Sequence, residues 1–419
     1  MSIRKRSWIT KKGPSEAWIV DYIDQTGKRS VCQFSRRKDA VAFRDQTGVD
    51  VRNNSHVPRS ADITVAQAGE LWLKRARDAL EPKTADQYEQ HLRLHIVPFI
   101  GNTKISRIGI PEVRSFMDRL AEAGRSDAMV KSVRTSLSGI ISEAQERGHA
   151  VRNAVREMSI RNRGKDARHA ARRKGKLKVG EDIPSREEVA AIIAELTKQG
   201  TAYRELILTA IFTGMRASEL RGLRWSDVDF KHKRIHVTQR ADANNQMGRP
   251  KSEAGERRIP MFEMVTNTLK DWKARCPKGE LDLVFPTSEG TVQRHENIVR
   301  RGLWGPQIAA GLTKQKLLRT VGRKPVLKDG KEQYVTVAKY EGLHALRHFF
   351  ASWCLNSKDR LGRGMNPKEV QELLGHSTIA LTMDTYGHLF ETTGDDEAMA
   401  ADEAALLATV PATKRQQNA

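Results

Sequence analysis

Six side chains in the C-terminal half of the chain suit the chemistry of a phosphodiester. An arginine can donate paired hydrogen bonds to phosphate oxygens. A lysine can protonate a leaving oxygen, and a histidine can exchange a proton with a reacting group. Together with one tyrosine, these residue types occur in the order Arg216, Lys251, His344, Arg347, His376 and Tyr386. Such a set predicts a site that binds a backbone phosphate.

The first arginine follows a glycine at the expected start of a helix. Gly214 allows a tight entry, and Arg216 lies near that entry. Glu219 lies one helical turn further on, where it can brace the guanidinium group. Taken alone, this pair is better explained as a surface arginine beside a glutamate at i,i+3.

Lys251 lies in the polar loop of a hairpin whose two strands are expected at 234–238 and 257–260. By itself it is an ordinary loop lysine. His344 and Arg347 share one face of a predicted helix and can present an imidazole and a cation to one phosphate. His344 and His348 are also spaced i,i+4, which suits a metal. The glutamate of the HExxH motif is absent, so we expect no metal here.

The last segment combines a helix end, a turn and a second helix. Gly375 is expected to end one helix, His376 to lie in the turn, and Ser377 to cap the next helix. Tyr386 then follows on that helix. Taken singly, a tyrosine on an amphipathic helix usually packs in a core, and a histidine in a turn is usually solvated.

Considered together, these segments closely resemble the tyrosine recombinases, especially the integrases of phages and integrative elements. That family's signature is an arginine box, a hairpin lysine, an HxxR pair, a His or Trp, and a tyrosine nucleophile, and the six residues match it in order. Glu219 matches the acidic residue that often accompanies the first arginine. The preceding helical stretch resembles the family's core-binding domain, through Thr84, Tyr88, residues 95–98 and Gly101. Residues 1–55 more loosely resemble its arm-site module.

The resemblance implies an enzyme that breaks and rejoins DNA through a 3′-phosphotyrosine at Tyr386. The two arginines of the set would bind the non-bridging oxygens, where transition-state charge collects. Lys251 would protonate the leaving 5′-hydroxyl, His344 would accept or return the tyrosine proton, and His376 would donate a hydrogen bond to the phosphate. Neither a metal nor ATP is expected as a cofactor, because cationic side chains take the role of metals.

The expected fold is multidomain and mainly α, with small β-sheets. It comprises an α+β arm-binding module of three strands and one helix at 1–55, an all-α core-binding (SAM-like) domain at 62–157, a basic linker at 158–181, a mixed α/β catalytic domain at 182–390, and a tail at 391–419. In the helical domain, Thr64 is expected to cap the first helix, and Pro98 with Gly101 to end the second. The core of the first module is expected to rest on Trp8, Trp18, Phe34 and Phe43.

The charge of the chain points to a polyanionic partner. Its 73 Lys and Arg against 51 Asp and Glu leave a formal net charge of +22, which favours nucleic acid over a ribosomal or membrane-surface role. Dense basic runs are expected to contact the DNA backbone, although each could be a solvated charge run. The candidates are Arg4, Lys5, Lys11, Lys12, Arg163, Arg172, Arg173 and Lys174.

The remaining signals concern the compartment. The chain has no apolar run long enough to cross a bilayer, and no apolar segment follows the basic N-terminus. We therefore expect a cytoplasmic, bacterial protein that associates with the nucleoid when it acts. The cysteines Cys32, Cys276 and Cys354 are far apart, which suggests reduced thiols without a zinc site.

The expected partners are double-stranded DNA, at core and arm sites, and three further copies of the chain, because joining two duplexes at two strands each requires a tetramer. The Ala-rich stretch after Asp395 is a candidate helix for docking on a neighbour, or else a frayed tail. An excision factor or a host DNA-bending protein is a further possibility. Two alternative functions remain open, a non-catalytic DNA-binding regulator on the same scaffold and a type IB topoisomerase.

Overall fold

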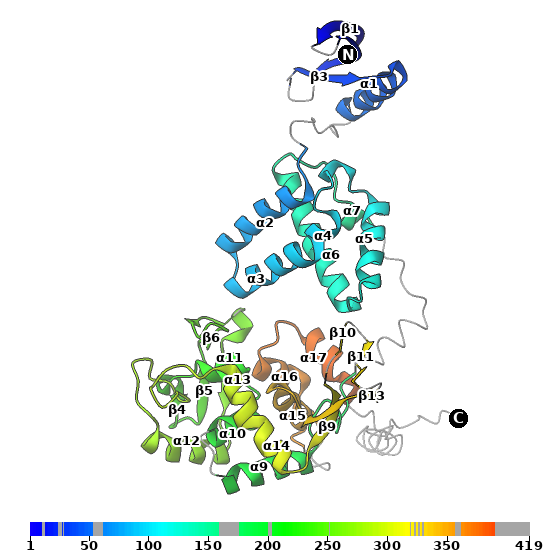
Figure 1. Ribbon diagram of the computed structural model, residues 1–419. Helices are drawn as coiled ribbons and strands as arrows, with labels where there is room; N and C mark the ends of the chain where they lie inside the picture. Colours follow the sequence, from blue (N-terminus) through cyan, green and yellow to red (C-terminus); the bar gives the residue numbers. More distant parts are fainter. Residues whose placement is uncertain are drawn as a thin grey trace, which may run out of the picture. The chain divides into compact units, whose positions relative to one another are not determined.

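The computed structural model describes residues 1–10, 13–23, 27, 29–52, 62–158, 176–199, 203–250, 252–318, 320–321, 324–325, 327–328, 331–356 and 362–389. The chain divides into two compact units, one of residues 1–162 with 319–333, the other of residues 163–318 with 334–419 (Figure 1). Several of the residues singled out above lie outside the described ranges. They are Lys11, Lys12, Arg163, Arg172, Arg173, Lys174 and Lys251, together with the tail from residue 390.

The N-terminal module is the expected three-stranded sheet with one helix. Strands β1 (Ser2–Thr10), β2 (Gly13–Ile23) and β3 (Arg29–Phe34) form an antiparallel sheet in that order, and α1 (Arg37–Arg52) packs on it. The buried core consists of Val20, Tyr22, Cys32 and Ala40, with Ile3, Trp18, Phe34 and Phe43 packed against it.

The expectation that Trp8 belongs to this core was wrong. Trp8 pairs with Ser15, near the turn between β1 and β2. Strand β3 pairs only with residues 18–23 of β2, so the third strand does not reach the part of the hairpin that carries Trp8. The core therefore forms at the three-stranded end of the sheet, where Tyr22 takes the place that we had expected for Trp8.

The second part of the chain is all-helical. Its helices are α2 (Val65–Ala79), α3 (Pro82–Gln90), a π-helical segment (His91–Ile96), α4 (Val97–Ile100), a 3₁₀ turn (Ile105–Arg107), α5 (Ile110–Glu122), α6 (Asp127–Glu146) and α7 (Ala154–Glu157). Helix α2 packs against α3 and α6 around one apolar core. As expected, Thr64 caps α2, accepting a hydrogen bond from the backbone N–H of Gln67.

Pro98 does not end the second helix, contrary to our expectation. The chain stays helical from Pro82 to Ile100, and Gly101 is the capping residue that follows. Just before the proline the helix is π-type, with the Val97 N–H donating to the carbonyl of Leu92. This wider turn lets the chain accommodate a residue without an N–H donor, as local π-turns do elsewhere.

The C-terminal part is mixed. Its α-helices are α9 (Arg186–Gln199), α10 (Arg204–Thr213), α11 (Ala217–Arg221), α12 (Glu263–Arg275), α13 (His295–Asn297), α14 (Gly305–Ala309), α15 (His344–Leu355), α16 (Pro367–Leu374) and α17 (Ile379–Tyr386). A π-helical segment, Ile298–Trp304, joins α13 to α14. Three-residue 3₁₀ turns lie at Trp225–Asp227, Glu253–Gly255 and Gly387–Leu389.

Short strands also occur between residues 228 and 338. Strands β4 (Val228–Asp229), β5 (Arg234–Val237) and β8 (Arg257–Pro260) form an antiparallel sheet, which confirms the hairpin predicted at 234–260. Inside that hairpin, β6 (Arg240–Ala241) pairs with β7 (Met247–Gly248). Strand β9 (Thr313–Leu317) pairs with β14 (Tyr334–Ala338). The remaining pairs are β10 (Thr320–Val321) with β11 (Lys324–Pro325) and β12 (Leu327–Lys328) with β13 (Lys331–Glu332).

Helix α10 is the centre of this part. Every residue from Glu205 to Ile211 is buried, which is typical of a helix surrounded by other elements. It packs against α12 and α15, and its C-terminal end leads directly into the segment that carries Arg216. A helix buried almost along its whole length therefore positions the first predicted catalytic residue.

Candidate active site

Arg216 lies at a sharp corner between α10 and α11. Gly214 ends α10 with a left-handed backbone (φ 60°), and a Cβ there would lie 2.4 Å from the ring of Phe350. Only glycine fits both conditions. The Glu219 carboxylate accepts hydrogen bonds from the Arg216 backbone N–H and from its Nη1, each at 2.8 Å. Glu219 therefore braces Arg216, as the sequence predicted.

Arg347 is held by backbone carbonyls from two other segments. On α15, its side chain is only 1% exposed and donates to the Gly214 carbonyl at 2.7 Å and to the Leu374 carbonyl. Burial, and then the charge of Arg216, lower the pKa of Arg347 to about 9. It remains a cation at neutral pH, and a bound anion would relieve the cost of burying it.

Both arginines and one histidine of the predicted set line one pocket. A cavity of about 250 Å³ is lined by Met215, Arg216, Ala217, His295, Gly342, Leu343, His344 and Arg347. Burial, then the charges of Arg347 and Arg216, lower the pKa of His344. The pocket therefore offers cations and a largely neutral imidazole to a phosphate group.

His376 lies in the turn between α16 and α17, as expected. Gly375 ends α16 with φ 63°, and the His376 Nδ1 is hydrogen-bonded to the Thr382 hydroxyl at 2.9 Å. Burial, and then the charge of Arg347, lower the pKa of His376 to about 4. The residue that caps α17 is Thr378, which accepts from the Leu381 N–H. The expectation of Ser377 was wrong, because the chain turns one residue later.

Tyr386 is buried at the end of α17 and does not face the pocket. Only 1% of the residue is exposed, and its hydroxyl is hydrogen-bonded to His348 Nδ1 at 2.7 Å. Its ring lies parallel to that of His376, with centroids 6.4 Å apart. Burial raises the pKa of the Tyr386 hydroxyl to about 12, although Arg347 acts in the opposite direction. In the described state, the phenol is therefore buried beside the pocket and is not exposed in it.

Sequence reasoning missed two residues that contact the predicted set, His348 and Arg257. His348 stands one turn after His344, and the two rings meet edge to face with centroids 4.5 Å apart. We had weighed this spacing only as a metal motif. Arg257 donates two hydrogen bonds to Glu219, at 3.0 and 2.8 Å. The only signal for Arg257 is the alternation of buried and exposed side chains along β8. The side chain of Arg257 is buried, and that of Arg258 is exposed.

The two described candidates for DNA contact lie on β1. Both side chains are exposed and have acidic neighbours on β2. Lys5 contacts Glu16 at 2.6 Å, and Arg4 lies 3.9 Å from Asp21. Exposed pairs of this kind are weak, so both cations remain available to a phosphate.

In the described parts of the chain, no three His, Cys, Asp or Glu side chains are grouped as ligands for a metal ion. No described helix is both long and apolar enough to span a membrane. Cys32, Cys276 and Cys354 are free thiols.

Comparisons with known proteins identify the family of the chain. The model of the phage integrase family matches residues 185–392, and that of the phage integrase central domain matches residues 65–160. The fold and the matched segments define a tyrosine-type site-specific DNA recombinase. The chain belongs to the phage integrase family of tyrosine recombinases.

Several relatives are similar over different lengths. A tyrosine recombinase XerC-like protein of Caldanaerobacter subterraneus subsp. tengcongensis is 26% identical over 372 residues, 87% of this chain and 90% of the relative. The ICEBs1 integrase of Bacillus subtilis is 22% identical over 361 residues, 85% of this chain and 87% of the relative. The transposase from transposon Tn916 of Enterococcus faecalis is 26% identical over 206 residues, 48% of this chain and 46% of the relative.

Solved structures share the fold. The Tn1549 transposon integrase in complex with transposon right end DNA matches with a TM-score of 0.59 and 20% identity, over 82% of this chain and all of that one. A lambda integrase tetramer bound to a Holliday junction matches with a TM-score of 0.51 and 18% identity, over 89% of this chain and 95% of that one. The multidomain, mainly helical fold that the sequence predicted is confirmed.

Proposed function

We propose that this recombinase integrates and excises a mobile element by forming a 3′-phosphotyrosine at Tyr386. The observation that carries the proposal is the pocket where Arg216, His344 and Arg347 meet. Its arginines are fixed by Glu219 and by backbone carbonyls before any substrate binds. Preorganised donors of this kind stabilise charge that develops in a transition state. Relatives that are transposases and integrases of mobile elements support the same function.

In the proposed cycle, the two arginines hold the non-bridging oxygens of the scissile phosphate. The Tyr386 hydroxyl attacks the phosphorus atom, and His344 accepts the tyrosine proton. The P–O5′ bond breaks, and Lys251 protonates the leaving 5′-hydroxyl. His376 donates a hydrogen bond to the phosphate. In the described state the Tyr386 hydroxyl is hydrogen-bonded to His348. Before it can attack, the phenol must therefore turn toward the phosphate.

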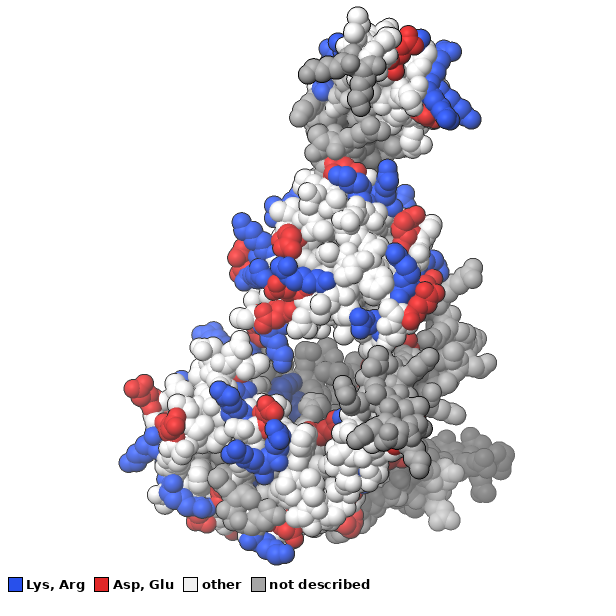
Figure 2. Space-filling view, viewed as in Figure 1, with Lys and Arg blue, Asp and Glu red and all other residues white. Residues whose placement is uncertain are grey.

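The partners follow from the same proposal. On the face that Figure 2 shows, many Lys and Arg side chains are exposed, and the net charge of +22 favours a polyanion. We expect double-stranded DNA at core and arm sites, and four protomers in the synaptic complex. Solved relatives include integrase–DNA complexes and a tetramer on a Holliday junction. The site of action would be the bacterial nucleoid, with an excision factor or a DNA-bending protein as possible helpers.

The test uses a nicked DNA duplex, on which the covalent protein–DNA adduct is trapped. Sequencing DNA junctions from a host that carries the gene supplies the target site. The nicked site is then incubated with the full chain in EDTA, because neither a metal nor ATP is required. We expect a covalent adduct that mass spectrometry locates on Tyr386. Tyr386→Phe should bind the same DNA without forming an adduct.

Three results would contradict the proposal. If the wild-type chain binds the site and no adduct appears, it is a DNA-binding regulator. If it relaxes plasmids that lack the site as fast as plasmids that carry it, it acts as a type IB topoisomerase. An adduct that persists in Tyr386→Phe would place the nucleophile elsewhere.

A further inference from the structure

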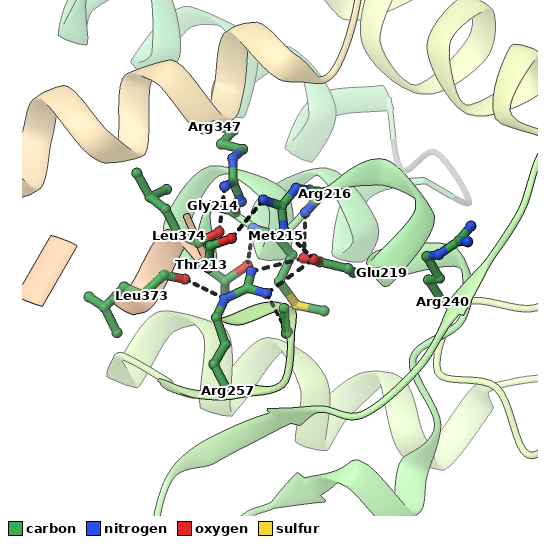
Figure 3. Close-up of polar contacts among 12 residues, drawn as sticks. Thr213, Gly214, Met215, Arg216, Glu219, Arg240, Arg257, Arg347, Leu373 and Leu374 are labelled. Atoms are coloured by element: carbon green, nitrogen blue, oxygen red, sulfur yellow. Dashed lines mark hydrogen bonds and ion pairs between the residues drawn. The ribbon is translucent and has the colours of Figure 1, made fainter. Parts of the chain in front are cut away.

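Three arginines converge on the C-terminal end of α16. Arg257 Nε donates to the Leu373 carbonyl at 2.6 Å, Arg347 to the Leu374 carbonyl, and Arg216 to the Gly375 carbonyl at 2.9 Å. These are three consecutive backbone oxygens at the negative end of a helix, where cations are favoured. Arg257 therefore belongs to the same cluster as the two arginines of the proposed phosphate site (Figure 3).

Glu219 is the carboxylate that joins two of these arginines. It is 2% exposed and accepts one side-chain hydrogen bond from Arg216 and two from Arg257. Burial alone would raise the pKa of Glu219, but the hydrogen bonds and charge of Arg257, and then the charge of Arg216, hold it below its usual value. Arg257 thus keeps Glu219 ionised, and the ionised carboxylate in turn fixes Arg216.

Arg257 also contacts the hairpin loop at Gly255. Its Nη1 donates to the Gly255 carbonyl at 3.0 Å, four residues after Lys251 in the chain. A single guanidinium group therefore connects the segments of three predicted catalytic residues: Arg216 through Glu219, the Lys251 loop through Gly255, and His376 through the end of α16. Figure 3 shows its guanidinium group between Glu219 and the carbonyl of Leu373.

The burial of Arg257 separates its role from that of a DNA contact. Its side chain is 6% exposed, whereas that of Arg216 is 37% exposed. All its described hydrogen bonds go to the protein. Arg257 is therefore placed to affect the reaction through the groups that it holds.

We propose that Arg257 is a positioning residue of the recombination site, which aligns Arg216, the Lys251 loop and the His376 turn around one scissile phosphate. The inference rests on the proposed function, because it takes these three segments as the phosphate site. Lysine cannot replace it, since one ammonium group cannot make a bidentate contact with Glu219 and also reach two carbonyls. Small displacements of positioned groups can lower a rate about 100-fold.

The experiment measures adduct formation on the nicked duplex under saturating DNA. For Arg257→Met and Arg257→Lys, we expect the rate to fall on the order of 10- to 100-fold, while DNA affinity stays within about threefold, since binding rests mainly on many backbone contacts. Arg258→Met is the matched control, because the adjacent side chain is exposed, and it should keep the wild-type rate. Circular dichroism and thermal melting establish that each variant is folded at the assay temperature.

Two further arms separate positioning from general destabilisation. In Arg257→Ala, guanidinium chloride at low concentration should restore part of the rate relative to the same concentration of sodium chloride. Because guanidinium destabilises folded proteins, such rescue cannot come from added stability. The double variant Glu219→Gln with Arg257→Met should raise the activation free energy of adduct formation by less than the sum of the increases in the two single variants, because both changes break the same contact.

The outcomes are distinguishable. A wild-type chain that forms no adduct refutes the proposed function, whatever the variants do. If wild-type protein forms the adduct and folded Arg257→Met does so within about threefold of it, Arg257 does not position the site. Loss of rate in proportion to the loss of folded protein, without guanidinium rescue, would also overturn the inference.

Discussion

At the scale of single residues, the contact between His348 and Tyr386 defines the state of the site. The phenol is buried, and its described partner is the His348 ring nitrogen. Burial, then His344 and Arg347, lower the pKa of His348 to about 4, so at neutral pH the ring is uncharged and its Nδ1 can accept the phenolic proton in a hydrogen bond. We had expected His344 to exchange a proton with Tyr386 during the reaction, which stays a prediction; in the described state the phenol is hydrogen-bonded to His348.

This pair leads to a prediction about stability. His348→Phe fills a similar volume but leaves the buried Tyr386 hydroxyl without its described acceptor, which should lower the free energy of unfolding by about 1–3 kcal/mol. For a domain of this size, each kcal/mol corresponds to a melting shift of roughly 2–4 °C. Thermal melts of the full chain without DNA measure the effect.

Tyr386→Phe supplies the control for this pair. The double variant should be less destabilised than the sum of the two single variants, because each change removes the same hydrogen bond. Additive effects would show that the contact does not contribute to stability. The comparison concerns folding alone and requires no knowledge of the target DNA.

The types and order of the candidate catalytic residues could be predicted from the sequence, but their partners could not. Arg216 and Glu219 are near in the chain, so local spacing was enough to predict their contact. Arg257 lies 38 residues from Glu219 and is chemically identical to its exposed neighbour Arg258. Which of two adjacent arginines turns inward depends on the register of β8 against β5, and that register is set by packing that local spacing does not encode.

At the scale of elements, the site depends on where helices end. Helices α10 and α16 both finish with a left-handed glycine, and both leave carbonyls that accept hydrogen bonds from arginine. The unpaired carbonyls at a helix end normally need a cap or water. Here side chains of the proposed active site fill that role, so the positions of the helix ends and of the guanidinium groups are set together.

Gly375→Ala tests this coupling. Its backbone is left-handed, and a Cβ there would lie 2.7 Å from the Ala254 carbonyl and 3.0 Å from Arg257 Nη1. Left-handed strain alone costs about 1–2 kcal/mol, and the displaced contacts should lower the adduct rate as well. Melting and adduct formation measure the two effects. Gly311→Ala is the matched control, because Gly311 also has positive φ, at 74°, but a Cβ there meets no atom within 4 Å.

In this comparison, the two variants should lose similar stability, while only Gly375→Ala should lose more adduct rate than its folded fraction explains. Equal adduct rates in both variants would show that the end of α16 tolerates displacement.

Element boundaries were predictable wherever a local signal fixed them. Thr64 caps α2 and Gly375 ends α16 as expected, because each acts on the backbone within a few residues of itself. Pro98 lies inside a continuous helix, since a π-turn accommodates it. Trp8 lies outside its module's core, since strand pairing decides which part of a hairpin a third strand covers. Tertiary packing, rather than local preference, decided both positions.

At the scale of the whole molecule, the excess of basic residues governs the expected affinity for DNA. A formal excess of +22 predicts that affinity for DNA falls steeply with salt. Neutralising several phosphates should cost on the order of 10³-fold in affinity between about 50 and 200 mM salt. Band-shift titrations across that range measure the slope of log K against log salt.

Arg4→Ala combined with Lys5→Ala refines this test on DNA that carries an arm site. Each lost phosphate contact should make the slope shallower by about one, while adduct formation on a core site alone should not change. An unchanged slope would show that β1 does not contact the backbone. The remaining basic candidates near residues 163–174 are tested in the same way, and their contacts with DNA stay predictions.

The concealment of Tyr386 bears on how a cell tolerates such an enzyme. Most encounters between a basic protein and a chromosome are at irrelevant sequences. If Tyr386 is the nucleophile, as proposed, a residue that is only 1% exposed cannot attack the DNA backbone in such an encounter. On the proposed mechanism, DNA scanning and DNA breakage are therefore separated in this form of the molecule. Cleavage would require Tyr386 to become exposed first, so the fidelity of recombination would begin with the burial of one side chain.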